Sequence, residues 1–270
     1  MIVCEHSKVE LTENGWSIKI PPKVGGVIGV FPGQTLFGYI EPETGRLLLS
    51  PLRLTSTVSY FRMFLDDVRG SLAGVTELFS KRGLNILTGG AFGFSNIWVS
   101  EFLVDFADSA SPDEVMAEIS DMGGFVTSRE ITELFPVSFN LSATYMVEAD
   151  DGDWVKVVSD EPAEAQVKRA KYAVVKAWPR IRAMFIDFFP PDSGLVHIRA
   201  RIKDVPGSLK KLTEVIGAHV NLNALDELHH DEVSGVWNAY GELVIGELGD
   251  LVVRAKQLDT VAEFEATQLN

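Results

Sequence analysis

The residues of this chain that are best placed to do chemistry lie in a short loop, Asp204-Val205-Pro206-Gly207-Ser208-Leu209. The loop follows an apolar run, residues 196–202, that is typical of a strand, and it opens a helical pattern over residues 208–219. A strand that turns sharply into a helix at Pro-Gly exposes backbone N–H groups at the helix start. Because these groups and the helix dipole attract negative charge, the loop predicts a site for a carboxylate or a phosphate.

The chain contains this loop twice. Asp67-Val68-Arg69-Gly70-Ser71-Leu72 repeats the pattern, and Thr76-Glu77 then matches Thr213-Glu214. After a slip of one residue, Leu84-Asn85-Ile86 matches Val220-Asn221-Leu222. Agreement of this kind at equivalent places predicts a diverged internal duplication.

Each copy has the pattern of strand, helix, two strands, helix and strand. In the first copy we expect strands at 58–65, 85–92, 97–106 and 125–131, with helices at 71–82 and 112–122. In the second we expect strands at 196–203, 221–228, 236–245 and 261–267, with helices at 208–219 and 250–258. This order predicts an antiparallel four-stranded sheet with two helices on one face.

The remaining segments lie before and between the copies. Residues 1–56 show short apolar and alternating runs bounded by Gly and Pro, which predict a β-rich segment. In residues 132–192, alternation over 137–148 and the run 154–158 predict a hairpin, and 162–189 predicts a long helix kinked at Pro179. The predicted fold class is therefore α+β, with two ferredoxin-like βαββαβ modules at 57–131 and 193–270, a β-rich N-terminal segment and a hairpin-plus-helix insert.

Composition narrows the class of partner. The net charge of −14 disfavours nucleic acid and anionic membrane surfaces. The single cysteine, Cys4, excludes an intramolecular disulfide framework. The first residues lack the pattern of a signal peptide, and no apolar run has the length of a membrane span. We therefore expect a cytoplasmic protein.

At the repeated loops the chain resembles the ACT domain family, small ferredoxin-like regulatory modules, often paired, that bind amino acids and related effectors. The resemblance covers both copies, somewhat over half of the chain. It rests on Asp204-x-Pro206-Gly207-x-Leu209 and on Asn221-Leu222-Asn223 in the second copy. The first copy departs from the pattern, because Arg69 replaces the proline and Asn85 is followed by Ile86-Leu87.

The resemblance implies where an effector binds, namely between the loop of one module and the second strand of a partner module. An amino acid would place its carboxylate on the helix-start N–H groups and its ammonium on Asp67 or Asp204. The implied ligand-binding residues are Asp67, Val68, Arg69, Gly70, Ser71, Leu72 and Asn85 in the first copy, and Asp204, Val205, Pro206, Gly207, Ser208, Leu209, Asn221 and Asn223 in the second. With Arg69 in place of the proline, the first site would either favour a more acidic ligand or be silent, that is, bind no effector.

A purely structural explanation of the same residues stays open. Gly70 and Gly207 suit a turn, Ser71 and Ser208 suit helix caps, and the asparagines can bond their own loops. Other clusters carry weaker signals. Cys4 and His6 are only two possible metal ligands, and residues 226–232 are typical of a solvated acidic turn. The run 89–93 does not open a helix as a phosphate loop does. Taken together, these weak signals lead us to predict no cofactor and no metal.

These patterns predict a non-catalytic regulator of amino-acid metabolism that binds a small effector. Two alternatives stay open: a regulatory interaction subunit of a separate biosynthetic enzyme, and an enzyme whose catalytic part lies in residues 1–56 or 132–192. Unpaired sheet edges also predict association of modules, and a homodimer is the simplest form.

Overall fold

The computed structural model describes residues 2–13, 15–107, 110–130, 141–160 and 165–269. It forms two compact units. One unit combines Met1–Pro51 with Ala143–Asn270, and the other is Leu52–Ser142. The division of the sequence into segments at 56, 131 and 192 stays a prediction.

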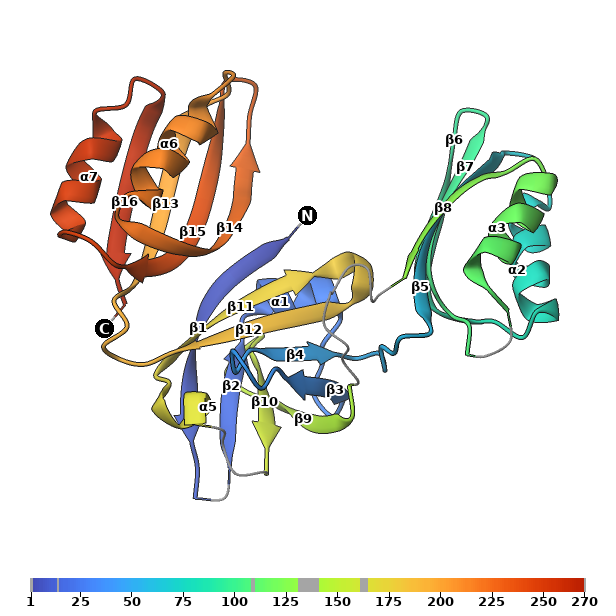
Figure 1. Ribbon diagram of the computed structural model, residues 1–270, viewed down its shortest axis with the longest axis horizontal. Helices are drawn as coiled ribbons and strands as arrows, with labels where there is room; N and C mark the ends of the chain where they lie inside the picture. The colour runs from blue at the N-terminus through green and yellow to red at the C-terminus, as the bar shows by residue number, and fades with distance from the viewer. Residues whose placement is uncertain (1, 14, 108–109, 131–140, 161–164, 270) are drawn as a thin grey trace. The chain divides into compact units, whose positions relative to one another are not determined.

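The centre of the first unit is a closed barrel of eight antiparallel strands (Figure 1). Around the barrel the strands follow the order β1-β11-β12-β4-β3-β9-β10-β2. Their bounds are β1 Val3–Leu11, β2 Trp16–Ile20, β3 Thr35–Ile40, β4 Leu47–Ser50, β9 Ala143–Ala149, β10 Val155–Ser159, β11 Tyr172–Trp178 and β12 Ala183–Phe189. Closure leaves the barrel with no unpaired edge.

Alternating apolar side chains fill the barrel. Trp16, Ile18 and Ile20 of β2 are buried in its core, as the period-two pattern predicts. Helix α1, Pro22–Ile28, adds Val24 and Ile28 to the same core. A short helix, α5 (Ala165–Arg169), buries only Val167.

The barrel overturns the predicted fold class. The chain is mostly β-sheet, with an eight-stranded closed barrel and few helices, and not two ferredoxin-like modules with a separate β-rich segment and a hairpin-plus-helix insert. Residues 172–189 form two strands and not a helix, and Pro179 lies in a short 3-10 turn, η1 (Pro179–Ile181), between them. The start of the expected strand at 137–148, and of the expected helix, lies outside the described residues.

The reason for the error lies in strand β11. Ala173 and Val175 point into the barrel core, whereas Tyr172 and Val174 pack in a second apolar cluster on the outside of the barrel. A strand that is buried on both faces shows no alternation of apolar and polar residues. Its apolar run therefore cannot be told from a buried helix by periodicity alone.

The second unit has a four-stranded antiparallel sheet in the order β6-β7-β5-β8. Its elements are β5 Val58–Asp66, α2 Ser71–Lys81, β6 Asn85–Phe94, β7 Ile97–Asp105, α3 Pro112–Asp121 and β8 Phe125–Glu130. Both helices cover one face of the sheet (Figure 1), where Phe61, Met63, Val75 and Val115 form the core. Ser111 caps α3 by accepting a hydrogen bond from the backbone N–H of Glu114 at 3.2 Å.

The C-terminal part of the first unit has a sheet in the order β14-β15-β13-β16. Its elements are β13 Leu195–Lys203, α6 Ser208–Gly217, β14 Val220–His230, β15 Ser234–Leu243, α7 Leu248–Lys256 and β16 Val261–Gln268. Helices α6 and α7 cover one face. On the sheet's other face, Ala224 and Tyr240 pack with Cys4 and Val174 of the barrel. No helix among the described residues is long and apolar enough to cross a membrane.

Candidate functional site

The two predicted loops have the same backbone geometry. Gly70 precedes α2 with φ +97°, and Gly207 precedes α6 with φ +89°. Glycine adopts this left-handed conformation without the steric cost that a Cβ imposes. A Cβ at either glycine would meet no atom within 4 Å, so there is open space beside both glycines. No side chain caps either helix.

Each loop is tied to the turn between the second and third strands of its own sheet. The backbone N–H of Asp67 donates to the carbonyl of Asn96 at 2.9 Å, and that of Asp204 donates to the carbonyl of Val233 at 2.9 Å. The turn beside Asp204 also supplies a titratable group. His230 Nε2 lies 3.4 Å from Asp204 Oδ2, and its Nδ1 lies 2.9 Å from Glu227 Oε1. The hydrogen bond with Glu227, followed by the charge of Asp204, raises the pKa of His230.

The two serines at the helix starts differ. The hydroxyl of Ser71 donates to the carbonyl of Asp66 at 2.7 Å, which closes the loop on itself. Ser208 is 2% exposed, and its hydroxyl has no hydrogen-bond partner among the described residues. A buried polar group without a partner costs free energy. A ligand that forms a hydrogen bond with the Ser208 hydroxyl would remove that cost.

The asparagines lie far from the loops of their own sheets. At one end of the C-terminal sheet Lys203 pairs with Ser234, and at the other end Leu195 pairs with Glu242, which pairs with Asn221. Asn221 is therefore at the opposite end from Asp204. Asn85 likewise pairs with Asp105, the partner of Val58 at the beginning of β5. The structure brings neither asparagine to the loop of its own module, and a site that combines them would need two modules.

Asn223 has a different neighbour. Its Oδ1 accepts a hydrogen bond from Lys176 Nζ of barrel strand β11 at 3.3 Å. Lys176 is also paired with Asp187 of β12. Burial lowers the pKa of Lys176, and the charge of Asp187 opposes that shift. Asn223 therefore joins a polar contact between the sheet and the barrel.

A buried polar cluster, which the sequence did not predict, lies where β1 meets this sheet. Asp226 Oδ1 accepts hydrogen bonds from Cys4 Sγ at 3.2 Å and Asn238 Nδ2 at 2.9 Å. Asp226 Oδ2 accepts from the backbone N–H of Cys4 at 3.2 Å and lies 3.6 Å from Lys23 Nζ. Asp226 and Asn238 pair with each other within the sheet. Cys4 lies in the first strand of the chain, so no sequence signal could link Cys4 to these two residues.

The cluster does not support the metal alternative. Burial, followed by the charge of Asp226, raises the pKa of the Cys4 thiol, which is 0% exposed. Nδ1 of His6 lies 3.4 Å from the hydroxyl of Tyr240, so His6 has a protein partner and does not point to a metal ion shared with Cys4. Among the described residues no group of three or more His, Cys, Asp or Glu side chains could hold a metal ion.

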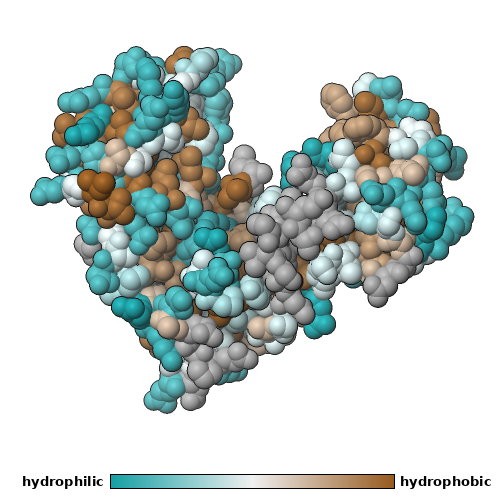
Figure 2. Space-filling view, in the orientation of Figure 1, coloured by the Kyte–Doolittle hydropathy of each residue, from teal (hydrophilic) through white to brown (hydrophobic). Residues whose placement is uncertain are grey.

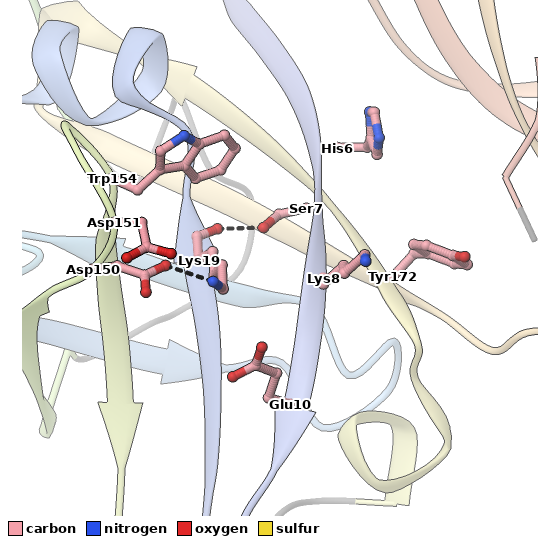
Figure 3. Close-up of a pocket in the computed structure, with 9 residues that line it drawn as sticks. All are labelled: His6, Ser7, Lys8, Glu10, Lys19, Asp150, Asp151, Trp154 and Tyr172. Carbon is pink, nitrogen blue, oxygen red and sulfur yellow. Dashed lines mark hydrogen bonds and ion pairs between the residues drawn. The ribbon is translucent and has the colours of Figure 1, made fainter.

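The outer wall of the barrel has a polar hollow of about 460 Å³ (Figure 3). Side chains of both charges surround it, and Lys19 Nζ pairs with Asp150 Oδ2 at 2.8 Å. The hollow is lined by His6, Ser7, Lys8, Glu10, Lys19, Asp150, Asp151, Trp154 and Tyr172. Lys19 and Asp150 therefore already form an ion pair with each other in the wall of the hollow.

No protein-family model matches the chain, and no curated protein matches it. Among solved structures, an unknown protein from Galdieria sulphuraria is similar with 8% identity and a TM-score of 0.31, over 79% of this chain and 99% of that one. A putative glycine cleavage system transcriptional repressor has 11% identity and a TM-score of 0.29, over 79% and 97%. The prephenate dehydratase of Staphylococcus aureus has 9% identity and a TM-score of 0.25, over 86% and 72%. At these TM-scores the likeness carries no argument about function.

Proposed function

We propose that this protein is a non-catalytic regulator that binds an amino acid at the start of α6. The observation that carries the proposal is the uncapped helix start behind Gly207, together with the buried hydroxyl of Ser208 that has no partner. The resemblance of the loop sequence to ACT domains agrees with this assignment. The backbone N–H of Ser208 already donates to the carbonyl of Val205 at 3.1 Å. The next N–H groups, those of Leu209 and Lys210, and the Ser208 hydroxyl would hold the carboxylate of the ligand.

The ammonium group of the ligand has a partner in Asp204. That carboxylate is exposed, and its neighbour His230 is also exposed. A ligand can therefore approach Asp204 without breaking a buried contact. One zwitterion would then satisfy both the helix dipole and the carboxylate, which a plain anion such as phosphate cannot do.

The α6 site is a better candidate than the α2 site. At α2 the hydroxyl of Ser71 is already used by the carbonyl of Asp66. Arg69 also brings a cation to the position of Pro206, which would repel an ammonium group. We therefore infer that the first loop is silent or prefers a more acidic ligand.

Regulation would follow from linkage. The loop before α6 is bonded to the turn between β14 and β15, and β14 carries Asp226 at the contact with the barrel. A ligand shifts an equilibrium between two arrangements only by its difference in affinity for them. The two arrangements would be two positions of the C-terminal sheet against the barrel, and they would differ at the contact around Cys4 and Asp226.

Thermal melting with each of the twenty amino acids tests the proposal. A ligand present at about 100 times its dissociation constant stabilises a protein by about 2.7 kcal/mol, which gives a measurable rise in melting temperature. Gly207→Trp would fill the open space beside Gly207 and abolish the rise. Gly33→Trp is the matched control, because Gly33 also has a positive φ of +84° and open space around it, so the control has the same backbone strain.

The outcomes separate the functions. A rise with one amino acid that is lost in Gly207→Trp and kept in Gly33→Trp supports an effector sensor. A rise that survives in Gly207→Trp contradicts the site. No rise with any amino acid would favour the interaction subunit.

A further inference from the structure

The helix-free face of the β6-β7-β5-β8 sheet carries a row of apolar side chains across all four strands. Phe64 of β5 pairs with Phe125 of β8 on one side and with Val99 of β7 on the other. Val99 in turn pairs with Phe92 of β6. Residues in register point to the same face of a sheet. Because the neighbours Phe61 and Met63 belong to the core under the helices, this row lies on the opposite face.

The side chains of this row and its surroundings are unusually exposed. Phe92 is 60% and Phe125 is 63% exposed, and beside them Phe94 is 73% and Ile97 is 40% exposed. Phe94 pairs with Ile97 in the same alternation as Phe92 with Val99. Figure 2 shows hydrophobic side chains gathered over the β6–β7 end of this unit. A contiguous apolar patch on a protein surface marks an interaction site.

The face also contains a hollow beside the row. It has a volume of about 640 Å³, and its lining includes Phe64, Phe92, Val99 and Gly90. Gly90 pairs with Glu101, so it belongs to the same face, and a Cβ there would meet nothing within 4 Å. The face therefore has an apolar projection, the Phe92 ring, beside a recess whose lining also includes the charged residues Arg62 and Glu101.

Charges of both signs lie in the neighbouring row of the face. Arg62 pairs with Glu101 in the sheet register, and Arg62 Nη2 is 2.7 Å from Glu101 Oε1. Both side chains stay about one-third exposed, at 33% and 35%. Under a two-fold rotation Arg62 of one copy can face Glu101 of the other, which is the reciprocal contact that an isologous interface requires.

The C-terminal sheet shows what happens to its helix-free face. There Ala224 and Tyr240 are covered by barrel strand β1, and Asp226 and Asn238 bond to Cys4. That covered face is lined with polar groups that match the barrel. The face with Phe64 and Phe92 differs, because its exposed side chains are mainly aromatic and its charged pair, Arg62 and Glu101, is one-third exposed.

We propose that this aromatic face docks on the same face of a second copy of the chain. The two sheets pack face to face, each Phe92 ring enters the recess of the other sheet, and each Arg62 lies beside the partner's Glu101. The interface uses a sheet face, and so it differs from the edge pairing that the sequence predicts. It does not depend on the proposed effector site.

Charge reversal tests the interface in trans. Arg62→Glu gives the face two carboxylates, and Glu101→Arg gives it two guanidinium groups, so each variant repels its own copy. We expect sedimentation equilibrium to show that either variant weakens the dimer by about tenfold or more. An equimolar mixture of the two variants should restore a dimer, because the acidic face of one then meets the basic face of the other.

Two further variants complete the experiment. Phe92→Ser removes the projection and should also weaken the dimer, while Val253→Ser should not, since Val253 is similarly exposed, at 57%, but lies on α7. Circular dichroism checks that each variant is folded. A wild-type protein that stays monomeric at several hundred micromolar overturns the proposal. So does a dimer that survives all the face variants, which would mean edge pairing, or a mixture that stays monomeric.

Discussion

The Cys4 thiol donates a hydrogen bond to Oδ1 of Asp226 over 3.2 Å, and so joins the first strand of the barrel to the second strand of the C-terminal sheet. The bond is buried, and Asn238 reinforces it from β15 through its contacts with the carbonyl of Cys4 and with Asp226. The first strand of the chain thus covers the face of a sheet at the other end of the sequence.

Cys4 should be unreactive in the native protein. Its side chain is 0% exposed, and burial raises the pKa of the thiol, so little thiolate forms at neutral pH. We expect a disulfide reagent such as DTNB at pH 8 to modify Cys4 more than about 100-fold more slowly in native than in urea-unfolded protein. Because Cys4 is the only cysteine, the reaction reports this contact alone. Equal rates in the two states would show that β1 does not stay docked.

The same thiol should make stability depend on alkaline pH. In the unfolded chain Cys4 loses its proton near its ordinary pKa of 9.0, whereas the folded state keeps that proton to higher pH. The stabilisation is therefore complete below pH 9 and decreases as pH rises above it, by up to about 1.4 kcal/mol per pH unit. Urea unfolding from pH 8 to pH 10 should show this slope in wild type and a shallower slope in Cys4→Ala. Parallel slopes would contradict it.

Asp226→Ala should destabilise the first unit by about 2–4 kcal/mol. Asp226 is only 4% exposed, and its loss leaves the Asn238 amide and the Cys4 backbone N–H with fewer partners. The free energy of unfolding by urea measures the effect. Asp151→Ala, an exposed carboxylate of the same unit, is the control and should change stability by less than about 0.5 kcal/mol. A similar small change for Asp226→Ala would mean that the cluster does not hold the sheet.

Effector binding should weaken at acidic pH. When His230 is protonated it pairs with Asp204, and it then competes with the ammonium of the ligand for that carboxylate. Glu227 and Asp204 raise the pKa of His230, and Asp231 contributes in the same direction. His230 is therefore protonated, and competes with the ligand, at a higher pH than an ordinary histidine. Calorimetric titration between pH 5.5 and 8 should show affinity rising with pH in wild type. His230→Ala should flatten that profile, and an unchanged profile would remove Asp204 from the site.

Local backbone chemistry was predictable, and long-range closure was not. Helices α2 and α6 begin where the Gly-Ser pairs predict, and Gly70 and Gly207 have the positive φ that only glycine adopts readily. The barrel does not follow from local patterns, because strands β3 and β4 pair with β9 and β12 from a segment more than ninety residues later. Strand β11 is buried on both faces, so its sequence does not alternate between apolar and polar residues.

The candidate site was predictable to a similar degree. The loop Asp204–Leu209 carries its own geometry, so the turn at Gly207 and the helix start after it follow from the sequence, whereas the lack of a side-chain cap there does not. The position of Asn221 depends on sheet register, which places it at the other end of the sheet. The unpartnered hydroxyl of Ser208 depends on side-chain packing, which no local pattern contains.

The most direct test of the central claim is amide NMR of the isotopically labelled protein during titration with each of the twenty amino acids. The account predicts that, for one of them, the backbone N–H resonances of Leu209 and Lys210 shift in a saturable manner, and that these shifts disappear in Gly207→Trp but remain in Gly33→Trp. Saturable shifts confined to the hollow around Lys19 and Trp154, or no saturable shift with any amino acid, would contradict it.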